Sequence, residues 1–202
     1  MPDEDKLPWD PLPVAQAAAL FADADFPWWI AGGYAIELAV GRALRQHGDT
    51  DVGLPRGHQL AARRLLVDWD CWASDPPGTL RPWPVGETLP DKVHDIWCRE
   101  HPTGRWRLQL MLDEGDALTW RSRRDPRLAR PIDEVRRWTA DGIPYVAPEI
   151  QLHYKAKSAR AKDELDLAAA LAAMQPRQRA WLIDALTLTY GAEHPWLRRI
   201  AR

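Results

Sequence analysis

Residues 28–54, WWIAGGYAIELAVGRALRQHGDTDVGL, contain the pattern that decides the fold. A short apolar run ends at Gly32 and Gly33, and two adjacent glycines let the backbone turn sharply and approach a ligand closely. Apolar residues then recur at helical spacing from Tyr34 to about residue 44, which predicts a helix that lays one face on a sheet. A strand, a glycine turn and a helix N-terminus together expose free backbone N–H groups, which suit a phosphate.

Two carboxylates, Asp49 and Asp51, follow where residues 49–54 change to the alternating pattern of a strand. Alternation places both on one face. Neighbouring like charges are unfavourable unless a cation neutralises them, and carboxylate oxygens suit Mg²⁺ that also bridges nucleotide phosphates. The pair predicts metal-assisted phosphoryl or nucleotidyl transfer. Taken alone, each motif has a plainer explanation: a turn for the two glycines, and a solvated strand end for the two aspartates.

Composition describes a folded protein without a strong overall charge. The chain has 202 residues, is 46% hydrophobic and has a net charge of −2, so it can bury a core but has no field that recruits nucleic acid or anionic lipid. Cys71 and Cys98 lack the spacing of a metal site, which favours a reduced chain over a disulfide scaffold. No apolar run approaches membrane-spanning length. We therefore expect a soluble, cytoplasmic protein.

The remaining segments predict an α+β protein. Residues 1–13 are rich in proline and charge, which predicts an irregular arm. Residues 70–91 are rich in Pro, Gly and Trp, which predicts a surface loop over the sheet. The loop either shapes an acceptor pocket or is only a variable connection between two elements. Periodicity predicts helices at 14–24 and 59–68, and strands at 92–100, 105–113 and 142–146 with a hairpin turn at 101–104.

The segment 114–139 is arginine-rich and is expected to be mostly loop, with a short helix after Pro131. Its arginines could meet phosphates, but nothing in the sequence fixes their geometry, so a solvated basic loop is favoured.

From residue 147 the pattern predicts one helix, with Pro148 in its first turn, that continues through IQLHYKAKSARAKDELDLAAALAAM. Helical spacing places Lys155, Lys162, Asp163 and Asp166 in one stripe, which by itself also describes an exposed, ion-paired helix. Further helical segments follow at 180–188 and 196–200. The expected division is a core of residues 1–146 and a C-terminal helical lobe of residues 147–202.

The order of the motifs carries a resemblance to a known family. Gly-Gly-Tyr34, Gly41-Arg42 and Arg45-x-His47-x-Asp49-x-Asp51 together resemble the signature of the nucleotidyltransferase superfamily, above all the aminoglycoside and lincosamide adenylyltransferases. The pattern also recurs in nucleotidyltransferase toxins of toxin–antitoxin systems. The run from Lys155 through Arg160, Lys162 and Asp163 to Asp166 resembles a second segment of the same relatives, in which lysines approach the triphosphate.

The resemblance implies a fold, an activity and a set of roles. The implied fold is a mixed sheet flanked by helices with a small C-terminal helical lobe. The implied reaction uses Mg²⁺ and ATP, or another NTP, to move a nucleoside monophosphate to a hydroxyl of a small molecule such as an aminoglycoside-like antibiotic. The implied roles are metal binding and catalysis by Asp49 and Asp51, and nucleotide binding by Gly32, Gly33, Tyr34, Arg42, His47, Lys155 and Lys162. His47 could equally brace the loop.

One position departs from the resemblance. Relatives place a third aspartate in the strand where this chain has Gln109, so the resemblance makes Gln109 the third predicted catalytic position. A glutamine can coordinate a metal weakly through its carbonyl oxygen but cannot act as a base. Asp113 on the same strand face and Asp95 on the partner strand are the two candidates to replace the third carboxylate. The plainer explanation for both is an ordinary solvated or hairpin-pairing residue. Two alternatives therefore stay open: a catalytically weak nucleotide-binding or antitoxin-paired module, and a toxin that modifies tRNA or a protein.

Overall fold

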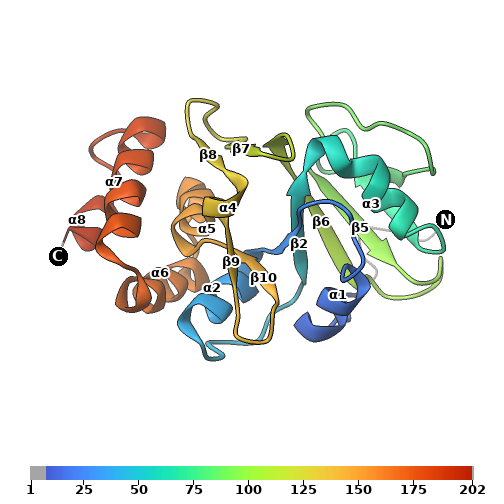
Figure 1. The fold of residues 1–202 in the computed structure, drawn as a ribbon, viewed down its shortest axis with the longest axis horizontal. Helices are drawn as coiled ribbons and strands as arrows, with labels where there is room; N and C mark the ends of the chain where they lie inside the picture. The colour runs from blue at the N-terminus through green and yellow to red at the C-terminus, as the bar shows by residue number, and fades with distance from the viewer. Residues whose placement is uncertain (1–7, 202) are drawn as a thin grey trace.

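The computed structural model describes residues 8–201 as one mixed sheet covered by helices, which confirms the predicted α+β class (Figure 1). The predicted irregular arm is described only from residue 8 onward, because residues 1–7 lie outside the described part. The strands are β1 (Trp29–Ile30), β2 (Asp51–Pro55), β3 (Asp70–Ser74), β4 (Leu80–Pro82), β5 (Asp95–Arg99), β6 (Leu108–Gly115), β7 (Thr119–Arg121), β8 (Ala129–Pro131), β9 (Arg136–Trp138) and β10 (Pro144–Val146). They lie in the order β4-β3-β5-β6-β2-β1-β10-β9, and β7 and β8 extend from β6.

The stretch that opens the analysis folds as strand, helix and strand. Helix α2 (Gly32–Val40) begins at the first glycine and ends at Gly41, whose φ of 77° no β-carbon-bearing residue adopts easily. It therefore stops about four residues short of the predicted end. Strand β2 pairs antiparallel with β1 and parallel with β6, which places it at the centre of the sheet. Asp49 lies just before β2 and Asp51 is its first residue.

Two predicted loops contain strands, so these expectations were wrong. Residues 70–91 hold the pair β3 and β4, and residues 114–139 hold β7, β8 and β9. Their pairing depends on partners elsewhere in the chain, and prolines such as Pro82 and Pro131 are tolerated at the ends of short outer strands. The predicted hairpin between β5 and β6 and the helix α4 (Ile132–Val135) after Pro131 are confirmed.

The single long helix predicted from residue 147 is also wrong. Helix α5 (Pro148–Lys155) ends in a 3-10 turn (Ala156–Ser158), and α6 (Ala161–Ala173) begins afresh after it. The break occurs because Ala159 and Arg160 are extended, and Asp163 accepts a hydrogen bond from the backbone N–H of Arg160, which caps the new helix. Lys155 and Asp163 are therefore brought together by a turn, not by helical spacing.

The remaining helices cover the sheet and build the C-terminal region. Two helices lie beside the strands at one end of the molecule, α1 (Val14–Leu20) and α3 (Gln59–Leu65), and a 3-10 turn (Arg56–His58) precedes α3. At the other end lie α7 (Pro176–Tyr190) and α8 (Leu197–Ile200) (Figure 1). Ile36 of α2 is fully buried in a cluster with Leu152, Leu167 and Leu182 of the C-terminal helices. Helix α2 therefore packs between sheet and helices. Within the described residues, no helix is long and apolar enough to cross a membrane.

Candidate active site

A cavity of about 490 Å³ collects many of the predicted site residues at the start of α2 and β2. Its lining includes Gly32, Gly33, Asp49, Asp51, Lys155 and Lys162. A narrower space of about 50 Å³ shares Gly32 and Asp51 with it and reaches Asp113 on β6. A larger cavity of about 690 Å³ lies elsewhere, around the ion pair of Arg130 and Glu149, and none of the predicted site residues lines it.

Gly32 brings the backbone into direct contact with a carboxylate. Its φ of 66° is in the left-handed region, and a β-carbon at this position would overlap the Oδ2 atom of Asp51. The Gly32 N–H donates to Oε1 of Gln151 at 2.8 Å, so α5 supplies the partner for the first free amide of α2. Only glycine allows this approach.

The carboxylate pair fits a divalent cation. Loss of solvent and the negative charge of Asp49 raise the pKa of Asp51 to about 7, while the charge of Lys155 opposes the rise. A buried carboxylate whose ionised form is disfavoured by a neighbouring carboxylate, with both residues lining one cavity, is a donor set that suits Mg²⁺. Asp49 and Asp51 are the residues that would hold it.

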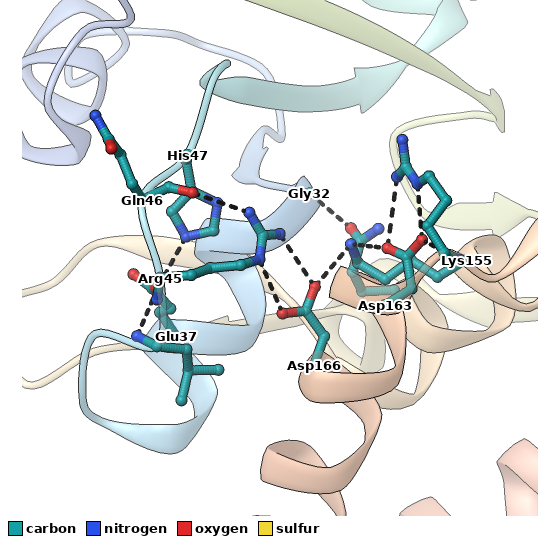
Figure 2. A network of polar contacts seen from close by, with 11 residues as sticks. Gly32, Glu37, Arg45, Gln46, His47, Lys155, Asp163 and Asp166 are labelled. Carbon is teal, nitrogen blue, oxygen red and sulfur yellow. Dashed lines mark hydrogen bonds and ion pairs between the residues drawn. The ribbon is translucent and has the colours of Figure 1, made fainter.

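Ion pairs hold several of the basic side chains that line the same cavity (Figure 2). The Nζ atom of Lys155 lies 2.9 Å from a carboxylate oxygen of Asp163 and 2.9 Å from one of Asp166. Asp166 also accepts from Arg45, at 3.2 Å, which ties the loop before β2 to α6. Desolvation raises the pKa of Asp163, but hydrogen bonds from Arg160 and Lys155 outweigh it and hold that pKa well below its usual range. Lys162 lines the same cavity.

Three residues predicted to bind nucleotide lie outside the cavity lining. The buried His47 is 2.8 Å from Oε1 of Glu37 and stacks on Tyr34 with ring centroids 4.1 Å apart. A β-carbon at Gly33 would overlap the His47 ring, so His47 braces the glycine turn from behind. Arg42 is exposed in the turn after α2, because the helix ends at Gly41 and the chain leaves the cavity there.

Gln109 lies directly opposite Asp51 in the parallel pairing of β2 with β6. Its amide donates weakly to the sulfur of Met111. The buried Asp113 accepts hydrogen bonds from Tyr154 at 2.8 Å and from Trp120 at 3.1 Å, so both its oxygens are occupied. Among the described residues, no group of three His, Cys, Asp or Glu side chains is arranged to hold a metal, so neither Asp95 nor Asp113 completes such a group with the pair.

Sequence reasoning missed three residues that border the predicted site. Gln151 and Tyr154 come from α5, where side chains three residues apart point the same way, and both line the cavity. Arg123 comes from the segment after β7 that was expected to be a solvated basic loop. Its side chain is only 12% exposed, which no local pattern could reveal.

The chain is similar to known proteins in part of its sequence and in its fold. A family model described as aminoglycoside-2''-adenylyltransferase matches residues 13–74, which include α2, the carboxylate pair and β2. No curated protein matches the sequence.

Solved structures of antibiotic adenylyltransferases have the same fold. The lincomycin-bound lincosamide antibiotic adenylyltransferase LnuA is 15% identical over 80% of this chain and 96% of its own, with a TM-score of 0.54. The solution structure of the antibiotic-resistance factor ANT(2'')-Ia is 16% identical over 89% of this chain and 92% of its own, with a TM-score of 0.56. A crystal structure of ANT(2'')-Ia with adenylyl-2''-tobramycin is 16% identical over 88% and 98%, with a TM-score of 0.54.

The predicted resemblance to the nucleotidyltransferase superfamily is thereby confirmed, and so is the predicted fold. The proteins that this chain resembles are adenylyltransferases, which are nucleotidyltransferase enzymes.

Proposed function

We propose that this protein is a cytoplasmic enzyme that uses Mg²⁺ and ATP to adenylylate a hydroxyl of a small, antibiotic-like acceptor. The observation that carries the proposal is the division of charge around one cavity. Asp49 and Asp51 line it beside Gly32, and Lys155, Lys162 and further lysine and arginine side chains line it as well. A metal-bound triphosphate needs this arrangement, because carboxylates hold the cation while basic groups neutralise the phosphates.

The residues that line the cavity would act mainly by binding the nucleotide and orienting its phosphates. Gly32 and Gly33 let the backbone approach a phosphate, and Lys155 and Lys162 lie where they could neutralise it. Mg²⁺ held at Asp49 and Asp51 would supply neutralisation of charge on the phosphate and activation of the hydroxyl. The acceptor oxygen bonds to the α-phosphorus and the bond to pyrophosphate breaks. Pyrophosphate leaves with the bonding electrons, and the hydroxyl proton passes to a base in the cleft or to water.

The choice of acceptor rests on the structural neighbours. LnuA is seen with lincomycin and ANT(2'')-Ia with adenylylated tobramycin, so small antibiotics with free hydroxyls are the first acceptors to test. Wild-type protein with ATP and Mg²⁺ should add one adenylyl group to at least one member of an aminoglycoside and lincosamide panel, as measured by mass spectrometry. Parallel reactions with tRNA and with proteins test the toxin alternative. Adenylylation of only those macromolecules would overturn the small-molecule assignment.

A second candidate is a nucleotide-binding protein with weak transfer. Gln109 faces Asp51 across the strand pair, at the position where a third carboxylate would act as base or metal ligand. This candidate predicts tight binding of Mg²⁺–ATP by calorimetry without transfer to any acceptor.

A further inference from the structure

Arg123 enters the candidate active site from a segment that the carboxylate and lysine motifs do not include. It follows β7, yet it lines both the main cavity and the narrower space that holds Asp51 and Asp113. Its guanidinium carbon lies 5.0 Å from the centre of the Tyr154 ring, and its side chain is 12% exposed. The cation is therefore held at a defined place beside Asp51 by packing on an aromatic ring.

Within residues 8–201, no carboxylate lies at charge-assisted hydrogen-bond distance from the Arg123 guanidinium. A carboxylate oxygen of Asp95 lies 3.7 Å from Nη1, whereas charge-assisted hydrogen bonds are about 2.7–2.9 Å long. The Nε atom is buried without a hydrogen-bond partner among the described residues. Burying a guanidinium is costly unless its donors are satisfied, and its fork matches carboxylates and phosphates. A fork held in this way suits a planar or tetrahedral oxyanion.

Its position indicates which oxyanion that is. Of the cavity's lysine and arginine side chains, Arg123 alone also lines the narrow space next to Asp51, whereas Lys157, Arg160 and Lys162 line only the main cavity. The reacting phosphorus of a nucleotidyl transfer has to lie at the metal-binding carboxylates, and the β- and γ-phosphates extend away from them. Arg123 is therefore next to the reaction centre.

We propose that Arg123 is a catalytic residue whose guanidinium binds the non-bridging oxygens of the α-phosphate. This inference rests on the proposed function and deepens it. As the acceptor oxygen bonds to the α-phosphorus and pyrophosphate leaves with the bonding electrons, negative charge increases on those oxygens, and Arg123 neutralises it without moving. The contact strengthens in the transition state, so Arg123 acts on kcat more than on the KM for ATP.

The test compares Arg123→Met with Arg124→Met, its exposed neighbour, which also lines the main cavity but not the narrow space. Calorimetry with AMP and with adenosine isolates the α-phosphate, because the two ligands differ only there. We expect wild type and Arg124→Met to prefer AMP, and Arg123→Met to lose about 10-fold of that preference. We also expect kcat to fall about 10²–10³-fold in Arg123→Met, with a change of only a few-fold in KM. Arg123→Lys keeps the charge but loses the planar fork, so its kcat and its preference for AMP should lie between those of wild type and Arg123→Met.

The outcomes separate two kinds of failure. If wild type binds ATP and Arg123→Met retains both its preference for AMP and its kcat, the inference is overturned and the proposed function stands. If folded wild type binds neither ATP nor AMP, the proposed function fails and the inference fails with it. Equal effects of Arg123→Met and Arg123→Lys on melting temperature, with kcat unchanged in both, would assign Arg123 a structural role and overturn the inference.

Discussion

Asp51 is where the chemical argument begins at the scale of single residues. It is the first residue of a central strand, is in contact with Gly32 and has a pKa raised to about 7 by burial and by Asp49. A carboxylate in that position is unfavourable to the fold unless a cation accompanies it, which is why we assign the pair to metal binding.

Replacing either carboxylate should separate function from stability. Asp49→Asn and Asp51→Asn should each lower kcat/KM by at least about 10³-fold, because each removes a charge that holds the metal but little volume. At pH 8 without divalent cations, the melting temperature of Asp51→Asn should equal or exceed that of wild type, because the wild-type group is ionised there at a cost to folding. Asp184→Asn, which removes an exposed carboxylate on α7 that lines neither cavity space, is the control. Activity within a few-fold of wild type in both pair variants would contradict their assignment.

Gln109 offers a gain-of-function test at the same scale. Since Gln109 faces Asp51 in register, Gln109→Asp should tighten Mg²⁺ binding, because a third negative oxygen ligand strengthens attraction for a hard cation. A base near the acceptor hydroxyl is worth about 10²–10⁴-fold, so a weak wild-type enzyme should become visibly faster. Calorimetry with Mg²⁺ and initial rates would measure both. Unchanged affinity and rate together would place Gln109 outside the reaction centre.

At the scale of elements, the candidate site depends on the backbone conformation at the start of α2. Gly32 and Gly41 stand at its two ends with φ values of 66° and 77°, but only at Gly32 would a β-carbon overlap another residue. The two glycines therefore form a matched pair: both need a left-handed backbone, and one also needs the space beside Asp51.

Alanine at each position should reveal that difference. Gly41→Ala should destabilise the protein by about 1 kcal/mol, through backbone strain alone. Gly32→Ala should cost more, about 2–4 kcal/mol, and should also displace the Asp51 carboxylate and weaken binding of Mg²⁺–ATP. Urea denaturation and calorimetry would compare the two. Equal losses of stability with unchanged nucleotide binding in both variants would remove the proposed contact between Gly32 and the site.

At the scale of the whole molecule, α5 joins the candidate site to the C-terminal helices. Its Gln151 accepts from Gly32, and its fully buried His153 contacts α7 through Thr189, whose hydroxyl is 3.0 Å from Nε2. Burial lowers the pKa of His153 to about 4, and the charge of Arg124 adds to the effect. The other ring nitrogen is buried without a hydrogen-bond partner among the described residues, so the fold has no place for the protonated ring.

His153 should make stability depend on pH. In the unfolded chain the pKa of His153 is near 6.5, so between about pH 6.5 and 4 His153 is protonated in the unfolded state but neutral in the folded state. The contribution of neutral His153 to the free energy of unfolding is fully present above pH 6.5 and is lost as the pH falls toward 4. The loss is up to about 3 kcal/mol. His153→Gln keeps a donor for Thr189 but cannot titrate, so it should lose less stability than wild type between pH 7.5 and 4.5 in urea denaturation. An identical loss in both proteins would rule out His153 as the source.

The sequence by itself determined the elements whose causes are local. Helical periodicity and adjacent glycines predicted the strand, turn and helix around Gly32, alternation predicted β5 and β6, and Pro148 marked the start of α5. The order of the motifs was enough to predict the fold and the resemblance to nucleotidyltransferases, because the carboxylates follow the glycines at a characteristic spacing.

Only the tertiary structure decided what depends on distant partners. The outer strands β3, β4, β7 and β8 form because neighbours elsewhere in the chain offer free N–H and C=O groups. The register that sets Gln109 against Asp51 spans more than fifty residues of intervening chain. Arg123 is enclosed beside Asp51 because α5 places Tyr154 under it. Pairing, register and burial are long-range properties, so no pattern within a short window of sequence contains them.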